Sequence, residues 1–418
     1  MFQRVKGTSD NFFEMAYWNG VIKKIEAHLK RYNFNQIDIP LIEHTSLFER
    51  GLGVETDVIS KQMFLLENKS SNSDSMCLRP EGTAGTMRAF LENQNQVTLP
   101  ARLFCYGSMF RYERPQKGRL REFHQVNLEI IGAKSILQDA YFIKMLQVLF
   151  IETLSLEDFV LKINFLGQPE DRAKYCQSLV ATLTPHKEQL CDVCKTRLDK
   201  NPLRILDCKS QTCQELTKQA PKLKEFFSNE TQAEFQLLQE TLQELAVTFI
   251  IDDQLVRGLD YYNKTVFEFV SVNLGAQSTF CGGGRYDGLA QQLGSKTEIP
   301  ALGCAIGMER LLMILENKKD FLSEKQAPLS CVIPMETAQN KVALHIADHL
   351  ASQGLTVEIL IDEQKIKNKM KKAGDLKATY ALIIGEDEQK ANSVMVKNML
   401  NGTQELIKQN NLVDYLKK

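Results

Sequence analysis

A group of cationic side chains lies in one short stretch of this chain, between two segments that read as β-strands. Residues 103–132 read LFCYGSMFRYERPQKGRLREFHQVNLEIIG, with a turn marked by a proline and a glycine. The cations are Arg111, Arg114, Lys117, Arg119 and Arg121. Strand alternation places Gln125, Asn127 and Glu129 together on one face of the returning segment. A basic loop beside such a platform suits a ligand with phosphate and ammonium groups, whereas the plainer interpretation is a solvated face.

Two further arginines occur where an anion could bind. Arg257 precedes Gly258 in LVRGLDYY, residues 255–262, where the glycine permits close approach of a ligand and the adjacent tyrosines could close a pocket. Arg310 ends GMER, residues 307–310, in the first turn of a predicted helix, where backbone donors and the helix dipole favour negative charge. The alternative for each is an ordinary surface arginine.

Two glycine-containing strings would bring backbone close to a ligand. Residues 281–289, CGGGRYDGL, are not a phosphate loop, because no Lys-Ser/Thr pair follows and the GxGxxG spacing is missing. The glycines instead indicate backbone that passes beneath a flat ring such as imidazole or adenine. In residues 78–84, LRPEGTA, a proline and a glycine fix a tight turn, and Glu81 or Thr83 could simply cap the helix that follows.

Four of the ten cysteines form two pairs, Cys191 with Cys194 and Cys208 with Cys213. Such pairs are typical of a zinc knuckle, but four residues between the members of the second pair make its spacing loose. Thiols without a metal are therefore the favoured interpretation. The N-terminal MFQRVKGTSD lacks the apolar core of a signal peptide, so the cysteines indicate a reducing compartment and a cytoplasmic location is expected.

Length and composition bound the remaining possibilities. A chain of 418 residues is expected to form two or three domains. Its 43% hydrophobic and 25% charged residues are typical of a globular protein, and no apolar run is long enough to cross a membrane. The net charge of −1 argues against nucleic-acid binding over the whole surface but leaves local patches open. One such cluster is Lys365, Lys367, Lys369, Lys371 and Lys372, which more simply reads as a solvated helix face.

The elements that must position these residues can be predicted coarsely. An amphipathic helix is expected over residues 11–32, capped by Asp10, and its apolar stripe comprises Met15, Trp18, Ile22, Ile25 and Leu29. Residues 36–42 read as a strand interrupted by a proline, and the polar run 68–75 as an exposed hairpin tip. Few strand formers occur between residues 168 and 247, which predicts a helical region. Beyond residue 329, strands and helices alternate, which predicts an α/β layer fold.

Several of these strings together resemble one family. Residues 110–125, FRYERPQKGRLREFHQ, are similar to motif 2 of the class II aminoacyl-tRNA synthetases in its histidyl-tRNA synthetase version. RGLDYY and GGGRYDGL resemble that family's two signatures, GMER resembles motif 3, and residues 36–42 with the segment after them resemble motif 1, the dimer-forming element. The resemblance implies an α+β fold, with an antiparallel-sheet catalytic domain and a C-terminal α/β anticodon-binding domain. The implied parts are residues 1–167 and 248–316 of the catalytic domain, a helical insertion at 168–247, a linker at 317–328 and the anticodon-binding domain at 329–418.

The implied function is that of a ligase. ATP would activate L-histidine to histidyl-adenylate, and the histidyl group would then pass to the 3′ end of tRNA(His). ATP with Mg²⁺, a homodimer and no membrane partner are expected, and the family's chemistry does not use zinc. Positioning and charge stabilisation, not a nucleophile, should carry this chemistry. A non-catalytic histidine-binding regulatory paralogue on the same fold is the alternative, although such subunits lack the anticodon domain and tend to lose the arginines; a pure nucleic-acid-binding module is disfavoured.

The resemblance also assigns roles by residue. Arg111 would contact the α-phosphate and the histidine carboxylate, Arg257 the charge that develops on the α-phosphate, and Arg310 the distal phosphates with Mg²⁺. These three arginines should therefore share one cavity. Expected ATP contacts are Arg111, Glu113 and Arg310. Expected histidine contacts are Glu81, Gly82, Thr83, Arg111, Gln125, Glu129, Arg257, Tyr261, Tyr262 and Tyr286. Expected contacts to the tRNA acceptor end are Gln116, Arg119 and Arg121.

Overall fold

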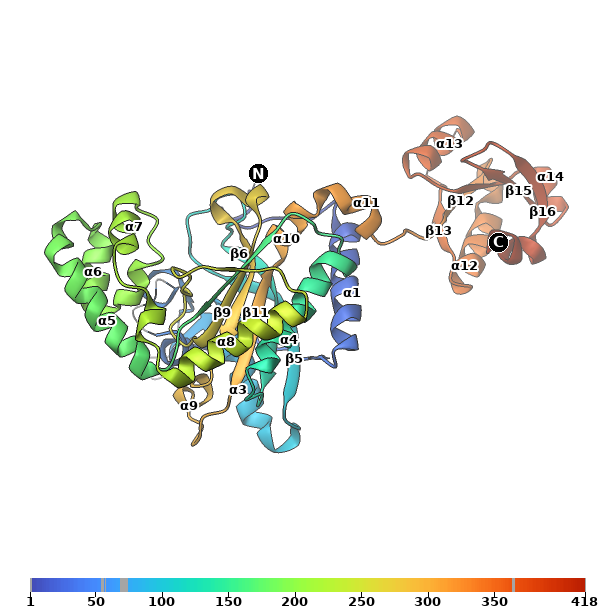
Figure 1. The fold of residues 1–418 in the computed structure, drawn as a ribbon. Helices are drawn as coiled ribbons and strands as arrows, with labels where there is room; N and C mark the ends of the chain where they lie inside the picture. The colour runs from blue at the N-terminus through green and yellow to red at the C-terminus, as the bar shows by residue number, and fades with distance from the viewer. Residues whose placement is uncertain (1, 54–55, 57, 68–73, 363–364, 418) are drawn as a thin grey trace. The chain divides into compact units, whose positions relative to one another are not determined.

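The structure, a computed structural model, describes residues 2–53, 56, 58–67, 74–362 and 365–417. The chain divides into two compact units, Met1–Ser323 and Glu324–Lys418 (Figure 1). Both combine helices with sheets, and antiparallel pairing predominates in the larger sheet, which confirms the α+β expectation. Within the described ranges, no helix has the length and apolar character needed to span a membrane.

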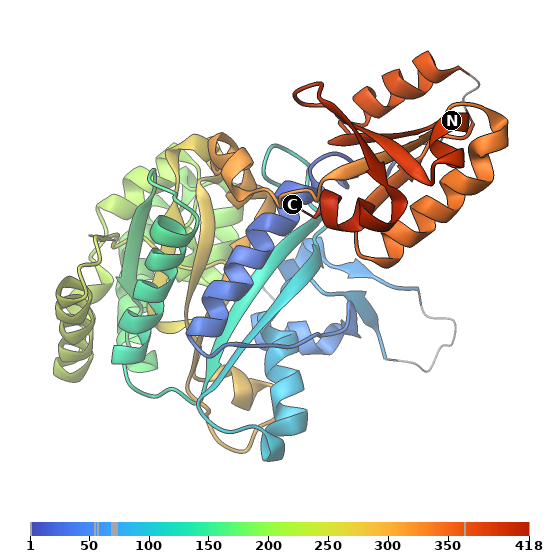
Figure 2. The same cartoon turned by 90° about the vertical axis from the view of Figure 1, so that its right-hand side faces the viewer.

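The larger unit is built on an eight-stranded sheet with the order β1-β5-β6-β11-β10-β9-β7-β8. The strands are β1 Asn35–Gln36, β5 Ala101–Phe110, β6 Glu122–Ile131, β7 Val160–Phe165, β8 Ile250–Ile251, β9 Asn263–Val270, β10 Thr279–Arg285 and β11 Ala301–Gly307. All neighbours are antiparallel except the β1–β5 and β7–β8 pairs. The predicted hairpin is present as β5 and β6, which run side by side (Figure 2) and are joined by the basic loop.

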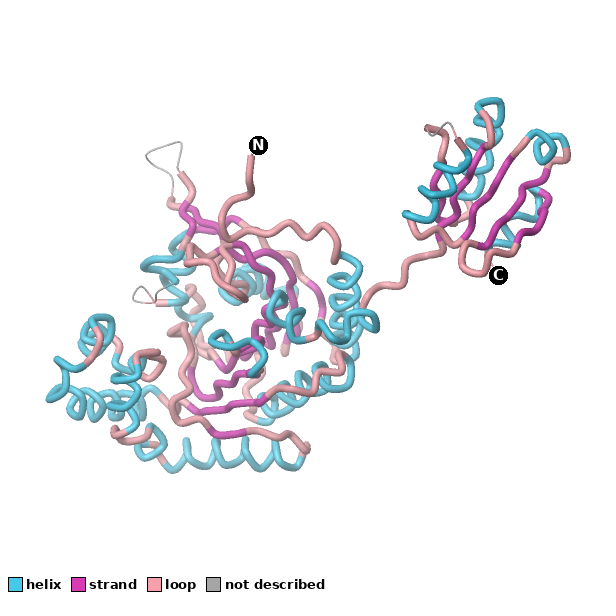
Figure 3. Tube along the Cα trace, turned by 90° about the horizontal axis from the view of Figure 1, so that it is seen from above, coloured by secondary structure: helices cyan, strands magenta, loops and turns pink. Residues whose placement is uncertain are grey.

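Helices cover both faces of this sheet (Figure 3). One face carries α1 Met15–Arg31, α4 Leu137–Val148, α8 Asn229–Glu244 and α10 Met308–Ile314, which share a core with Val126, Leu128 and Ile130 of β6. The opposite face carries α2 Thr45–Leu52, α3 Thr83–Asn93 and α9 Leu289–Gln292. Because side chains alternate along a strand, the burial of those three β6 residues turns the polar residues between them toward α3. The predicted alternation of β6 is thus confirmed.

Helices alone occupy the stretch between β7 and β8. They are α5 Pro169–Leu183, α6 Asp192–Lys200, α7 Gln211–Lys218 and α8, with one short 3₁₀ helix between each pair. The last helix packs on the sheet through Phe235, Leu238 and Leu242. The first three helices pack on one another around Leu179, Leu198 and other apolar side chains, next to the face that carries α3.

The first helix corrects two expectations. It begins at Met15, four residues after the predicted start, so Asp10 is not its cap; Glu14 occupies that position without a side-chain hydrogen bond. The buried face is Tyr17, Val21, Ile25 and Leu29, whereas Met15 is 43% exposed and Trp18 and Ile22 flank the core. Ile25 and Leu29 of the predicted stripe are therefore confirmed. The rest of the buried face differs because the Tyr17 hydroxyl donates to the carbonyl of Leu312 at 2.9 Å, which turns an amphipathic aromatic residue inward.

Residues 36–42 contribute to two separate sheets instead of one interrupted strand. Before Pro40, β1 pairs in parallel with β5, and after it β2 Ile42–His44 joins a three-stranded sheet, β2-β4-β3. The partners there are β3 Phe64–Leu65 and β4 Met76–Leu78, which are antiparallel. The predicted hairpin tip lies between β3 and β4, and its residues 68–73 are outside the described residues.

The smaller unit has the predicted α/β layering. Its sheet has the order β13-β12-β14-β15-β16. The strands are β12 Leu329–Pro334, β13 Thr356–Ile359, β14 Tyr380–Ile384, β15 Ser393–Asn398 and β16 Gln404–Lys408. One face is covered by α12 Asn340–Ser352 and α15 Leu412–Leu416, and the other by α13 Ile366–Asp375; α14 spans Glu386–Lys390. The lysines of α13 are not a purely solvated face, because buried Lys369 donates to the carbonyl of Pro334 at 2.7 Å.

Candidate active site

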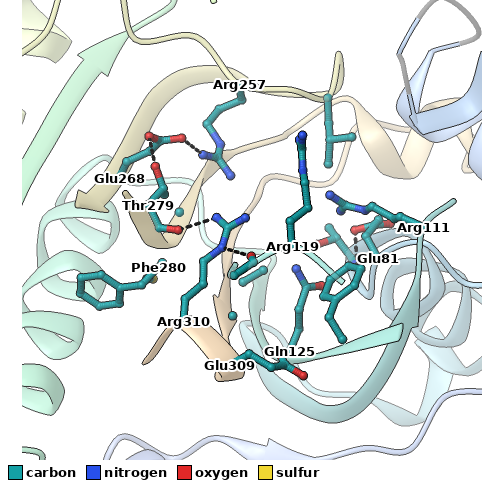
Figure 4. Close-up of a pocket in the computed structure, with 18 of the residues that line it drawn as sticks. Glu81, Arg111, Arg119, Gln125, Arg257, Glu268, Thr279, Phe280, Glu309 and Arg310 are labelled. Atoms are coloured by element: carbon teal, nitrogen blue, oxygen red, sulfur yellow. Dashed lines mark hydrogen bonds and ion pairs between the residues drawn. The ribbon is translucent and has the colours of Figure 1, made fainter. Parts of the chain in front are cut away.

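A cavity of about 300 Å³ lies on the face of the large sheet that carries Gln125 (Figure 4). Arg111, Arg257 and Arg310 all line this cavity, although they come from the end of β5, the loop before β9 and helix α10. Its floor is open because small residues of the central strands, Gly282, Ala305 and Gly307, stand beside Gln125. Other lining residues from the predicted set are Glu81, Thr83, Glu113, Arg119, Tyr261 and Tyr262.

Arg111 is fixed by the turn that precedes α3. Its Nε donates to the carbonyl of Pro80 at 2.9 Å, and its guanidinium lies 5.2 Å from the ring centroid of Phe123. Burial lowers the pKa of Arg111, while the carboxylates of Glu113 and Glu81 act in the opposite direction. These contacts hold the rest of the guanidinium group at the wall of the cavity.

Arg310 is positioned by two backbone carbonyls from different segments. Its Nε donates to Gly118 of the basic loop at 2.8 Å and its Nη1 to Thr279 of β10 at 2.7 Å. Burial lowers the pKa of Arg310, and the positive charges of Arg119 and Arg111 lower it further. The carboxylates of Glu113 and Glu268 act in the opposite direction, and an anion bound among the three arginines would likewise stabilise their charge.

Arg257 forms an ion pair with Glu268 of β9, and its guanidinium lies over the ring of Tyr262 at 5.5 Å. Burial would lower the pKa of Arg257, but the carboxylate of Glu268 raises it above its ordinary value. Thr279 donates to the other oxygen of Glu268 at 2.8 Å. Arg257 Nε is buried and has no hydrogen-bond partner among the described residues.

Close packing gives the glycine run a reason in addition to the predicted one. A Cβ on Gly282 would lie 2.5 Å from Nη1 of Arg257, so this glycine makes room for that arginine. Side chains at Gly283 and Gly284 would collide with the backbones of Gly303 and Thr265. Close packing of the strands and of Arg257 therefore requires these glycines, while Gly282 also lines the cavity, so the prediction that the run passes beneath a flat ligand stays a prediction.

Glu81 both caps a helix and faces the cavity. Its carboxylate accepts from the backbone N–H of Thr83 at 2.7 Å and of Ala84 at 2.8 Å, at the start of α3. Burial raises the pKa of Glu81, and these hydrogen bonds oppose the rise. A cap for the helix and a place at a ligand cavity, which the sequence offered as alternatives, are therefore compatible in Glu81.

Gln125 and two tyrosines form the part of the cavity nearest Glu81. No partner among the described residues lies near Gln125 Oε1, which is buried. The rings of Tyr261 and Tyr262 have centroids 4.5 Å apart, and burial raises the pKa of Tyr262 to about 12. A buried acceptor beside neutral phenols suits a ligand that brings its own N–H donor.

Three predicted histidine contacts lie behind the cavity wall and do not line it. Tyr286 donates its hydroxyl to Glu129, and the Thr83 hydroxyl donates to the same carboxyl group at 2.7 Å. Burial raises the pKa of Glu129 to about 8. Gly82 faces the side chain of Asn127, where a Cβ would lie 2.6 Å away. Glu129 and Tyr286 therefore hold Thr83, which does line the cavity.

The predicted tRNA-contacting residues separate. Arg119 lines the cavity and forms an ion pair with Glu113. Arg121 lies over the ring of Tyr112 at 4.1 Å, and its backbone N–H donates to Gly7 at 2.7 Å. Gln116 borders a different hollow with residues of the N-terminal segment 3–10. Arg119 thus belongs with the cavity arginines, a grouping that spacing along a loop does not reveal.

Sequence reasoning missed several lining residues. Glu268, Thr279 and Glu309 were not singled out, although Glu268 is the lone carboxylate in the apolar run TVFEFV, which is a usable signal. Glu309 accepts from the Nδ1 of His124 at 2.9 Å and from its backbone N–H, which joins α10 to β6. Arg285, in the string CGGGRYDGL, is structural because it is buried between Asp139 and Asp287.

Comparison with known proteins gives consistent matches over both units. A family profile described as histidyl-tRNA synthetase matches residues 14–311, and one described as anticodon binding domain matches residues 330–418. The histidine–tRNA ligase of Acetivibrio thermocellus is 40% identical over 417 residues, covering 99% of each chain. That of Fervidobacterium nodosum is 40% identical over 407 residues, covering 97% of this chain and 95% of its own. The crystal structure of apo S. aureus histidyl-tRNA synthetase superposes with a TM-score of 0.83 at 31% identity and covers 100% of both chains.

Proposed function

The chain belongs to the histidyl-tRNA synthetase family, and we propose from this premise how its cavity works. The protein is a histidine–tRNA ligase, an aminoacyl-tRNA synthetase that uses ATP, histidine and tRNA. In the first step a carboxylate oxygen of histidine bonds to the α-phosphorus of ATP, and the bond to the bridging oxygen of pyrophosphate breaks. In the second, a terminal ribose hydroxyl of tRNA(His) takes the histidyl group and AMP leaves.

The single observation that carries the residue assignment is the shared cavity of Arg111, Arg257 and Arg310. We assign the α-phosphate and the histidine carboxylate to Arg111 and the distal phosphates to Arg310. Arg257 stabilises the negative charge that grows on the α-phosphate. The lowered pKa of Arg310, caused by burial and then by its arginine neighbours, supports a polyanion as the natural occupant. Arg119 joins this set.

Histidine is assigned to the region between Glu81 and the two tyrosines. The ammonium group would lie against Glu81 and Thr83, and Gln125 Oε1 would accept a hydrogen bond from the ligand. Glu129 and Tyr286 act as positioning residues through the Thr83 hydroxyl. A site with such a buried acceptor rejects amino acids that lack a matching donor, because the acceptor would then remain unpaired.

The cavity carboxylates fit Mg²⁺ only as a companion of ATP. Glu81 is occupied by backbone N–H groups and Glu113, an expected ATP contact, by Arg119. Glu268 is occupied by Arg257 and Glu309 by His124. A cation that keeps several waters and binds mainly through phosphate oxygens suits such a site better than an all-protein cage. When bound, Mg²⁺ would neutralise charge on the distal phosphates near Arg310.

A homodimer and a cytoplasmic location form part of the same proposal. Exposed apolar residues around the three-stranded sheet support the dimer: Leu41, Ile42 and Leu65 are 46%, 51% and 62% exposed. The acceptor end of tRNA(His) is assigned to the basic loop, with Gln116 and Arg121 on its outer side and Arg119 at the cavity. The regulatory-paralogue alternative is not favoured, because this chain keeps the arginine set and the anticodon-binding match.

Amino-acid-dependent exchange of pyrophosphate with ATP tests the proposal. Exchange should depend on histidine and on Mg²⁺, and aminoacylation should follow with tRNA(His). The absence of exchange with histidine, although the protein binds histidine in calorimetry, would favour the regulatory paralogue. Exchange with another amino acid would redirect the assignment of the substrate pocket.

A further inference from the structure

A second cluster of chemically active groups lies in the helical region between β7 and β8, outside the cavity. Cys191 directly precedes α6 and Cys194 is in its first turn, while Cys208 precedes α7 and Cys213 is within its first turn. The four sulfur atoms all lie within 4.8 Å of one another. Three of these cysteines are buried and Cys191 is half-buried.

The spacing of the sulfur atoms fits a tetrahedral metal ion. A Zn²⁺ ion binds thiolates at about 2.3 Å, and a regular tetrahedron then separates its sulfur ligands by about 3.8 Å. The Sγ atoms of Cys191 and Cys208 are 3.8 Å apart. The larger separations, up to 4.8 Å, would need to close by at most about 1 Å, which side-chain rotation can supply.

Backbone donors already point at two of the sulfur atoms. The N–H of Cys191 donates to the Sγ of Cys213 at 3.3 Å, and the N–H of Ser210 donates to the Sγ of Cys208 at 3.4 Å. Such donors stabilise the negative charge of thiolates and fix their orientation, as outer-shell groups do around bound metals. Apolar thiols packed in a core would not require them.

We propose that Cys191, Cys194, Cys208 and Cys213 bind one structural zinc ion. Four protein ligands leave no open position, so the site is structural and not catalytic. The wide spacing of the second pair, which favoured free thiols at the level of sequence, is explained by the start of α7 at Gln211, which carries Cys213 back toward Cys208.

The segment between the two cysteine pairs contacts the loop that supplies Arg257 to the cavity. Arg204 donates to the carbonyl of Gly258 at 2.5 Å and to Asp260 at 3.2 Å. Asn201 donates to the same carboxylate of Asp260 at 3.1 Å. Zinc would therefore hold this segment against the residues between Arg257 and Tyr261, and its loss should raise the KM for histidine without removing a group that touches substrate.

Metal analysis of the full-length protein, purified without chelators from zinc-supplemented cells, tests the proposal independently of activity. We expect one zinc per chain, released by a mercurial thiol reagent. The Cys191→Ser/Cys208→Ser variant should lose the zinc. Cys176→Ser is the matched control, because Cys176 lies in α5 of the same helical region but outside the cluster, and this variant should keep the zinc.

A second measurement keeps the proposal testable even if the serine variant does not fold. Wild-type protein reconstituted with Co²⁺ should show intense thiolate-to-cobalt charge-transfer bands and the visible bands of tetrahedral coordination. Thiol titration of denatured, chelator-treated protein should find all ten cysteines reduced. Wild-type zinc no higher than in the cysteine variant, with no cobalt bands, would overturn the proposal, as would a thiol count four below the total, which would indicate two disulfides. Neither result would affect the histidine-dependent exchange.

Discussion

Replacement of Arg257 by alanine should reduce the rate of histidine-dependent pyrophosphate exchange by about a hundredfold. Removal of one preorganised donor at developing charge typically costs about 3 kcal/mol. A Coulomb estimate agrees, because unit charges about 4 Å apart interact by about 4 kcal/mol at an effective dielectric constant of about 20. The loss should fall mainly on kcat, since Arg257 is assigned to charge that grows in the transition state.

The ion-pair partner of Arg257 provides the decisive comparison. Glu268→Gln keeps the guanidinium, its position over Tyr262 and a hydrogen-bonding side chain at residue 268. Its expected cost is therefore that of one weakened hydrogen bond, about 1 kcal/mol or roughly fivefold in rate. Arg102→Ala is the matched control, because Arg102 is a half-buried arginine that contacts Gln138 and does not line the cavity.

The assay is steady-state exchange with kcat and KM measured separately for histidine and ATP, on variants whose melting temperatures match the wild type. If the exchange rate of Glu268→Gln is lower than that of Arg257→Ala, then Glu268 acts on the substrate and Arg257 only positions Glu268. If Arg257→Ala loses no more than Arg102→Ala, the assignment of Arg257 to the phosphate is wrong.

Three other variants test separate parts of the structure. Gln125→Ala should raise the KM for histidine by about tenfold, or about 1.4 kcal/mol, and leave the KM for ATP unchanged; a change confined to ATP would contradict its assignment. Burial raises the pKa of Glu129 to about 8, so between its ordinary pKa and pH 8 the native protein keeps a proton that the unfolded chain releases. The free energy of unfolding therefore falls as the pH rises through this range. Glu129→Gln should abolish that slope, so its melting temperature relative to wild type should increase from pH 5 to pH 8, and a pH-independent difference would disprove the idea. Arg285→Met leaves Asp139 and Asp287 buried without their cation and should lower the free energy of unfolding in urea by about 3–5 kcal/mol; a smaller cost than that of an exposed arginine replacement would show that the network is not structural.

The local pattern of the chain was sufficient for much of the fold. The two strands β5 and β6, the alternation in β6, the turn between them and the α/β order of the smaller unit depend on neighbours in sequence, and the structure confirms them. The start of α1 and its buried face could not be read in this way, because the contact of Tyr17 with Leu312, far along the chain, decides which side turns inward. Likewise, the proline at residue 40 signalled an interruption but not that its two sides join different sheets.

By itself the sequence determined the family, the two-part organisation and the identity of the arginines. Only the tertiary structure decided which side chains share a cavity, because β-sheet register joins residues more than a hundred positions apart. It assigned Arg119 to the cavity, set Glu129 and Tyr286 behind the wall, and added Glu268. It also gathered four thiols whose spacing had argued against a metal, since the start of a helix brings Cys213 back toward Cys208 in a way that a count of residues cannot show.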